Sequence, residues 1–186
     1  MSEQKIKILA LSGSLRTNSS ATSVLRQVCS LFPSIVECNI YDGLAKLPHF
    51  DGSNETPQEV LQFRKLIAAA GGVLICTPEY AFGVPGSLKN ALDWTVSSGE
   101  LTYKPVAVIT AASVGKNAHA SLLLTLSALT ATVAEEATLV IPFIRSKLNE
   151  KGEIKDADTL DAIKKVVDAF LKTIETTEKI DLDNLQ

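Results

Sequence analysis

IKILALSGSLRTNSS, residues 6–20, places a short apolar strand directly before a turn of small and polar residues and the start of a helix. Gly13 lets the backbone turn tightly behind the strand. The first amides of a helix lack partners within the helix and lie at its positive end, where an anion is stabilised. Arg16 adds a planar cation, and Ser14, Ser19 and Ser20 add hydroxyls. The junction therefore predicts a phosphate site.

The same residues also fit a plainer role. Serine is a common helix cap, so Ser19 or Ser20 would cap the helix and Arg16 would be an ordinary surface charge. The two interpretations differ only in whether an anion binds, and the turn taken alone leaves both open.

From this junction, apolar runs alternate with amphipathic stretches along the rest of the chain. The runs are short enough for strands and mostly too continuous to be half-exposed, which is typical of a buried parallel sheet. The alternation predicts an α/β fold, a doubly wound three-layer sandwich with its ligand crevice at the carboxyl ends of the strands. We expect strands at Ile6–Leu11, Ile35–Ile40, Gly72–Thr77, Pro105–Ala111 and Ala137–Ile141, and helices at Ser20–Phe32, Thr56–Ala69, Gly86–Val96, Ala118–Ala131 and Asp156–Glu175.

The length and composition of the chain limit the classes of protein to which it can belong. The 186 residues fit a single domain, 1–186, and 46% hydrophobic residues indicate a compact core. A formal net charge of −3 argues against a general nucleic-acid surface. The N-terminal residues lack a secretory pattern and no apolar stretch reaches membrane-spanning length, so we expect a cytoplasmic protein without a membrane span. The chain has three cysteines, Cys29, Cys38 and Cys76, and their spacing does not match a metal site. We expect them to be mostly reduced thiols, and we predict no metal site.

A second motif follows the third apolar run. Residues 77–94 read TPEYAFGVPGSLKNALDW, a loop shaped by two prolines and two glycines that leads into a helix. Its backbone amides and carbonyls can form hydrogen bonds to a flat heterocycle, while Tyr80 and Phe82 supply apolar surface. Glu79 and Tyr80 are expected on a cofactor or at a dimer contact, since they lie at the carboxyl end of a strand. The helix residues behind the loop are expected to pack and cap: Lys89, Asn90, Asp93 and Trp94. The long connection at residues 42–57 could border a substrate, but local packing is favoured for Tyr41, His49 and Phe50.

The two segments together resemble the NADPH-dependent FMN reductase family, flavodoxin-like flavoproteins that include quinone, azo-dye and chromate reductases. The first pattern matches Gly13, Ser14, Arg16 and Ser19, and the second matches Pro78, Glu79, Tyr80, Pro85, Gly86, Leu88–Ala91, Asp93 and Trp94. The resemblance spans nearly the whole chain. It implies a flavodoxin-like sheet of order 2-1-3-4-5, with the FMN phosphate on the first loop and the isoalloxazine on the second.

The resemblance also implies the chemistry. A hydride passes from NADPH or NADH to FMN, and the electrons then pass to a quinone, azo, flavin or metal-oxyanion acceptor in a ping-pong cycle. The flavin carries this chemistry, so no catalytic side chain is expected, and neither histidine has a nucleophile partner in sequence. The expected cofactor-binding residues are Ser12, Ser14, Arg16, Ser19, Ser20, Ala21, Pro78, Glu79, Tyr80, Ala81, Phe82, Ser113 and Gly115.

Three positions depart from the family pattern, and all lie on expected flavin loops. Ala21 and Ala81 stand where asparagine is common, and Lys116-Asn117 replaces a Gly-Gly-like turn. Each lost neutral hydrogen bond costs about 0.5 to 1.5 kcal/mol, so FMN affinity is expected to fall without being abolished. His119 is expected to be a solvated residue at the start of a helix.

Two rival functions follow from the same residues. A one-electron carrier of flavodoxin type is disfavoured by the weakly acidic composition and by Trp94, which falls behind its loop. A flavin-poor binding or assembly module is motivated by the three departures. By resemblance, a homodimer or homotetramer is expected, with Tyr80, Phe82 and the loop 83–86 at the subunit contact.

Overall fold

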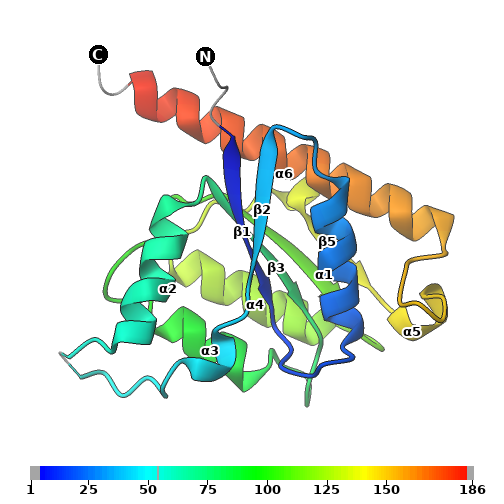
Figure 1. Cartoon of the computed structure of the whole chain (residues 1–186), viewed down its shortest axis with the longest axis horizontal. Coiled ribbons are helices and arrows are strands. Elements are labelled where there is room, and N and C mark those ends of the chain that lie inside the picture. Colours follow the sequence, from blue (N-terminus) through cyan, green and yellow to red (C-terminus); the bar gives the residue numbers. More distant parts are fainter. Residues whose placement is uncertain (1–4, 54, 184–186) are drawn as a thin grey trace.

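The computed structural model describes residues 5–53 and 55–183, with side chains as far as residue 177. Five strands form one all-parallel sheet in the order β2-β1-β3-β4-β5 (Figure 1). This arrangement confirms the predicted flavodoxin-like α/β fold. The strands are β1 (Ile6–Ser12), β2 (Val36–Tyr41), β3 (Gly72–Thr77), β4 (Val106–Ala111) and β5 (Thr138–Ile141).

Helices cover both faces of the sheet, because alternate strand residues point to opposite sides. On β1, Ile8 and Ala10 join a core cluster with α1 and α6, whereas Leu9 and Leu11 join a second cluster with α2, α3 and α4. Figure 1 shows α6 crossing at an angle to the strands, near the ends at which β1 and β2 begin. The elements are α1 (Ser20–Leu31), η1 (Leu44–Lys46), α2 (Gln58–Ala69), α3 (Gly86–Asp93), α4 (Lys116–Ala128), η2 (Glu135–Ala137), α5 (Ile144–Lys147) and α6 (Ala157–Asp183). None of these helices, within the described residues, is long and apolar enough to cross a bilayer.

The strand register brings three loops to one edge of the sheet. Ser12 at the end of β1 pairs with Cys76, and Thr77 at the end of β3 pairs with Thr110 on β4. The strand order reverses between β1 and β3, and a crevice forms at such a reversal in open α/β sheets. The turn after β1 and the loops after β3 and β4 therefore share this crevice.

Some local expectations were wrong. β2 is the edge strand that the predicted order requires, but its side chains are half-buried or exposed, so this run is less buried than expected. The last predicted strand begins later, since residues 135–137 form η2, and α5 is an additional short helix before α6.

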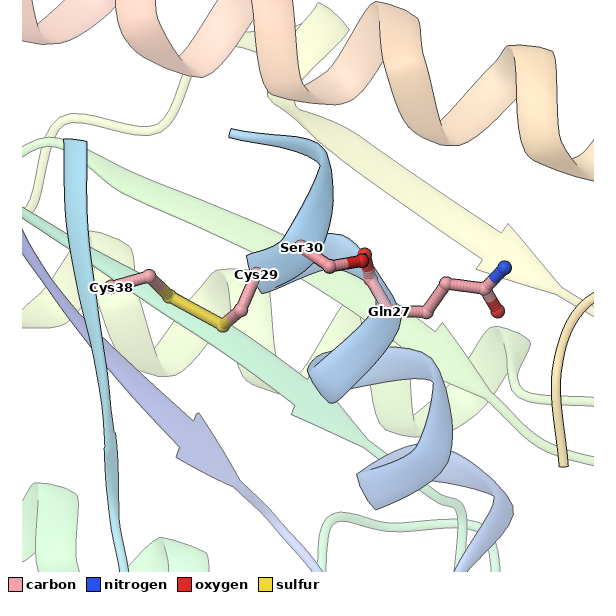
Figure 2. The surroundings of a disulfide bond; sticks show 4 residues. All are labelled: Gln27, Cys29, Ser30 and Cys38. Atoms are coloured by element: carbon pink, nitrogen blue, oxygen red, sulfur yellow. A yellow bond between two sulfur atoms is a disulfide. The ribbon is translucent and has the colours of Figure 1, made fainter. Parts of the chain in front are cut away.

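The expectation that all three cysteines are reduced was also wrong. Cys29 near the end of α1 and Cys38 on β2 form a disulfide, with their Cα atoms 5.7 Å apart (Figure 2). That separation lies within the usual range for disulfides. The pairing depends on where α1 packs beside the sheet edge, which sequence spacing does not reveal. Cys76 remains a buried free thiol, and burial raises its pKa.

We expect thiol titration to separate these three cysteines. Without reductant, native protein should show no reactive thiol, and denatured protein should show only Cys76. Denaturation after reduction should expose all three. Reduction should also lower the free energy of unfolding by roughly 2 to 3 kcal/mol, because the bridge closes a loop with a sequence separation of 9. Three thiols in unreduced denatured protein would contradict the pairing.

Candidate functional site

The turn after β1 approaches the end of β3 closely at Gly13. The Gly13 N–H donates to the Cys76 carbonyl at 2.8 Å. A Cβ atom at Gly13 would lie 2.8 Å from Thr77 Cβ, closer still to Thr77 Oγ1, and 3.1 Å from Leu88 Cδ2. The backbone of the turn therefore lies too close to the Thr77 side chain for any residue other than glycine at position 13.

Buried serine hydroxyls fix the shape of this turn. The Ser14 N–H donates to Ser12 Oγ at 3.3 Å, and Ser12 Oγ lies 2.6 Å from Thr22 Oγ1 in α1. The Arg16 N–H donates to Ser14 Oγ at 3.3 Å. These bonds tie the turn to the first turn of α1, so Ser12 and Ser14 hold the loop in position.

The start of α1 presents free donors. Ser19 caps the helix: its Oγ accepts the Thr22 N–H at 3.5 Å, and its carbonyl accepts the Ser23 N–H at 2.9 Å. The backbone N–H groups of residues 17–21 have no hydrogen-bond acceptor among the described residues. Arg16 beside them is exposed and forms no ion pair with a described residue. Capping and anion binding are therefore compatible here.

Tyr80 to Gly83 form a tight hairpin beside this turn. The backbones of Tyr80 and Gly83 exchange two hydrogen bonds of 2.9 Å, and the central residues Ala81 and Phe82 have φ values of 48° and 61°. Positive φ at both positions favours asparagine and glycine, and a residue with a Cβ there costs about 1 kcal/mol. The Tyr80 hydroxyl lies 3.4 Å from Ser14 Oγ. The hairpin is thus joined to the turn after β1.

Glu79 links the loop after β3 to the start of α4. Its Oε1 accepts the Gly115 N–H at 3.3 Å, and its Oε2 accepts the Ala118 N–H at 2.9 Å. The carboxylate therefore neutralises unpaired donors at a helix N-terminus, which is a favourable position for a negative charge. The structure gives Glu79 this supporting role in addition to a place on the wall of the cleft described below.

The helix behind the second motif anchors the long loop after β2. Trp94 Nε1 and Asn90 Nδ2 both donate to the Pro48 carbonyl, at 2.8 and 3.0 Å, and Asn90 Oδ1 accepts the Phe50 N–H at 2.8 Å. The Phe50 ring meets the Trp94 ring edge-on at a centroid distance of 5.1 Å. The packing roles predicted for the helix and for Phe50 are confirmed.

A cleft of about 810 Å³ opens where these loops meet. Its wall includes these expected cofactor-binding residues: Arg16, Ser19, Ser20, Ala21, Pro78, Glu79, Tyr80 and Ser113. The remaining expected residues lie beside the cleft and outside its wall: Ser12, Ser14, Ala81, Phe82 and Gly115. Ser12, Ser14 and Gly115 support the wall through the hydrogen bonds given above.

The cleft also includes a wall that sequence reasoning missed. Ser23 and Arg26 extend it along α1, and Arg145 on α5 and the loop 148–152 face them. The turn-forming sequence Asn149-Glu150-Lys151-Gly152 was a visible signal of a loop between β5 and α6. Its position opposite α1 depends on the packing of α5 and α6.

Two expectations for the loop after β4 were wrong. Lys116 and Asn117 begin α4 and lie outside the wall of the cleft. His119 is half-buried, not solvated, and its Nδ1 lies 2.9 Å from Thr110 Oγ1 on β4. Burial lowers the pKa of His119. α4 begins at Lys116, two residues before the predicted start at Ala118, and His119 lies within the helix with its ring toward β4.

Comparison with known proteins finds a matching family and several similar enzymes. The NADPH-dependent FMN reductase family model matches residues 6–145. A quinone reductase of Escherichia coli K12 is 32% identical over 182 residues, covering 92% of this chain and 97% of the relative. An NADPH azoreductase of a Bacillus species is 34% identical over 127 residues, covering 63% and 68% of the two chains.

A solved structure agrees with these sequence matches. The flavoenzyme NAD(P)H:(acceptor) oxidoreductase of Paracoccus denitrificans superposes with a TM-score of 0.82 at 26% identity, covering 92% of this chain and 98% of that one. The predicted resemblance is confirmed. The chain therefore belongs to the NADPH-dependent FMN reductase family, oxidoreductases with FMN as cofactor and NAD(P)H as co-substrate.

Proposed function

We propose that this protein is an FMN-dependent NAD(P)H oxidoreductase that reduces quinone-type acceptors by a ping-pong cycle, with the FMN phosphate on residues 16–21. The observation that carries the proposal is the row of unpaired amides at residues 17–21, with Arg16 beside them, in the wall of the cleft. An anion accepts hydrogen bonds from such amides and is stabilised by the helix dipole.

The residues present fit FMN. The cleft volume of about 810 Å³ lies within the usual 300–1,000 Å³ of cofactor sites. Donors for a phosphate lie together at the start of α1, at Arg16, Ser19 and Ser20. Pro78, Tyr80 and Ser113 border the other part of the cleft and offer apolar surface and hydroxyl groups to a ring.

When bound, FMN supplies the redox chemistry, taking a hydride from NAD(P)H and passing two electrons to the acceptor. The protein residues bind and orient. Amides 17–21 and Arg16 would hold the phosphate, and the loop after β3 would hold the ring. We propose quinones, azo compounds and flavins as acceptors because similar proteins are named a quinone reductase, an azoreductase and an FMN reductase, and metal oxyanions because the family resemblance implies them.

The test is the visible spectrum of freshly purified protein, followed by FMN titration and anaerobic mixing with NADPH and NADH. We expect stoichiometric FMN, bleaching by a nicotinamide and recovery on adding a quinone, with parallel lines in initial-rate plots. A protein that stays colourless and binds no added FMN at high micromolar concentration would overturn the proposal in favour of a binding module. Reduction in single-electron steps only would favour an electron carrier.

Ala81→Asn tests the hairpin directly. Asparagine tolerates the positive φ of 48° at this position and adds an amide near the proposed ring site. We expect the free energy of unfolding to rise by about 0.5 to 1 kcal/mol and FMN to bind up to about 10-fold more tightly.

The matched control is Ala120→Asn, on the exposed face of α4 away from the cleft. There the same substitution should lower stability by several tenths of a kcal/mol, as asparagine does in a helix. Urea unfolding and fluorescence titration measure both quantities. Equal effects of the two variants would contradict strain at Ala81.

The subunit contact, the domain organisation and the location of the protein stay predictions. We propose a homodimer or homotetramer with Phe82 at the contact, since its side chain is 74% exposed at the hairpin tip beside the cleft. Sedimentation velocity with the wild type and Phe82→Ser tests this. A single domain over 1–186 and a cytoplasmic location remain part of the same proposal.

A further inference from the structure

We propose that Arg145 on α5 binds an anionic group of the electron acceptor, so that aromatic quinones carrying a sulfonate or carboxylate are preferred to neutral ones. The proposal rests on the proposed function and names the class of acceptor for the same cleft. It gives a role to a cation that the proposed phosphate site does not use.

The cleft carries an excess of positive charge. Four cationic side chains and two carboxylates belong to its wall: Arg16, Arg26, Arg145, Lys151, Glu79 and Glu150. The chain as a whole has a formal net charge of −3. Glu79 accepts the Gly115 and Ala118 N–H groups, which stabilise its negative charge locally. The cleft therefore favours an anionic ligand on an otherwise acidic protein.

Three of the four cations are associated with α1, where the phosphate is proposed. Arg16 precedes this helix and Arg26 belongs to it, and a long helical side chain points back toward the helix N-terminus. Lys151 belongs to a loop that packs on α1, because a Cβ atom on Gly152 would lie 3.1 Å from Ser23 Oγ. These three cations are placed to serve the phosphate, whereas the fourth lies on a different element.

Arg145 belongs to a short helix that is attached to the loop after β4. The Phe143 N–H donates to the Ser113 carbonyl at 3.1 Å, and the Ile144 N–H donates to the Ala112 carbonyl at 3.2 Å. α5 follows β5, which is three strands from β1, or about 14 Å at the usual strand spacing. Arg145 therefore starts beside the loop that borders the proposed ring site, well across the sheet from the phosphate turn.

The helix is anchored, and its two cations differ in what they contact. Ile144 is 3% exposed and packs in the core cluster that includes residues of α1 and α6. Lys147 Nζ donates to Asp156 Oδ2 at 3.0 Å and to Thr159 Oγ1 at 2.8 Å. Arg145 is exposed and forms no ion pair with a described residue. Its guanidinium is thus available to a ligand from a fixed backbone position, which favours binding.

An arginine and a tyrosine in one cleft suit an aromatic anion. The planar guanidinium forms charge-assisted hydrogen bonds to the oxygens of an anionic group, and these are about twice as strong as neutral ones. Tyr80 is exposed in the wall of the same cleft and offers ring surface. The reaction itself is unchanged: a hydride from NAD(P)H and a proton from solvent convert the quinone to the hydroquinone and leave NAD(P)+.

The test compares Arg145→Ala with the wild type on 1,4-naphthoquinone and on 1,4-naphthoquinone-2-sulfonate. In the variant we expect KM for the sulfonate to rise about 10-fold, while KM for naphthoquinone and the FMN dissociation constant change less than about twofold. Arg145→Lys keeps the charge without the planar pair of donors, so the sulfonate KM should rise only about threefold. Comparing each quinone with itself removes the difference in reduction potential between the two acceptors.

Lys155→Ala is the matched control, because it removes one positive charge from an exposed position outside the cleft. It should keep the wild-type KM for both quinones. Three results for Arg145→Ala would overturn the proposal. These are an equal rise in KM for both quinones, no rise for either, and a rise in the FMN dissociation constant as large as that in the sulfonate KM, which would assign Arg145 to the phosphate.

A binding measurement separates this proposal from the proposed function. Naphthalene-2-sulfonate and its neutral counterpart naphthalene-2-sulfonamide are not quinones, so titrating them into FMN-loaded protein requires no turnover. We expect the wild type to bind the sulfonate about 10-fold more tightly than the sulfonamide, and Arg145→Ala to lose this preference. The same result in a protein that holds FMN but does not oxidise NAD(P)H would support the anion site and refute only the proposed reaction. Equal affinity of the wild type for the two ligands would overturn the anion site.

Discussion

Gly13→Ala should weaken FMN binding about 100-fold or more and lower the free energy of unfolding by about 1 to 3 kcal/mol. The added Cβ would meet the Thr77 side chain, so the turn after β1 must move away from β3. Movement of this turn misplaces the amides at residues 17–21, and losing two or more charge-assisted bonds to a phosphate gives the expected factor. FMN titration and urea unfolding measure the two effects.

Gly71→Ala is the matched control. A Cβ atom there has its nearest neighbours at 3.6 Å, which is ordinary van der Waals contact. It should bind FMN as the wild type does. Should Gly13→Ala keep the wild-type dissociation constant while losing stability, the turn would be a packing feature and the phosphate would lie elsewhere.

Trp94→Ala should lower the free energy of unfolding by about 3 to 5 kcal/mol, the usual loss when a buried large aromatic is truncated. Trp94 is only 2% exposed, and it holds the loop after β2 through the Pro48 carbonyl and the Phe50 ring. The loop around residues 48–53 should then become sensitive to protease. Urea unfolding and limited proteolysis with mass spectrometry report the two changes.

Trp94→Phe divides this effect into its parts. It keeps an aromatic ring against Phe50 but removes the Nε1 donor, so a loss of about 1 kcal/mol is expected. Val96→Ala, at a position 62% exposed, should change stability by less than about 0.5 kcal/mol. A loss below about 1 kcal/mol in Trp94→Ala would show that the loop after β2 is held by other contacts.

The sequence predicted the sheet well because the central strands are buried on both faces. Every residue of β3 and β4 is buried, so both strands appear as unbroken apolar runs. β2 has no such run, because an edge strand presents part of its surface to solvent. The glycine-serine turn and the loop after β3 were also predictable, since each follows a strand directly and carries a dense local motif.

What the sequence did not reveal depends on contacts between distant segments. Ile154 and Gln27 are 127 positions apart, yet their hydrogen bond joins the segment before α6 to α1. Cys29 and Cys38 have ordinary spacing and pair only because α1 packs beside the edge of the sheet. The conformation of Ala81 depends on the hairpin bonds between Tyr80 and Gly83, which composition does not indicate.

The bonds from Tyr80 to Ser14 and from Glu79 to Gly115 and Ala118 join three loops from three different strands. Three loops joined in this way have few alternative conformations. Binding of a flavin would therefore require little further ordering of the protein chain. Its association should then occur in a single fast kinetic phase, without a slow rearrangement afterwards. The lifetime of the complex, rather than the speed of its formation, would set how firmly the cofactor is retained.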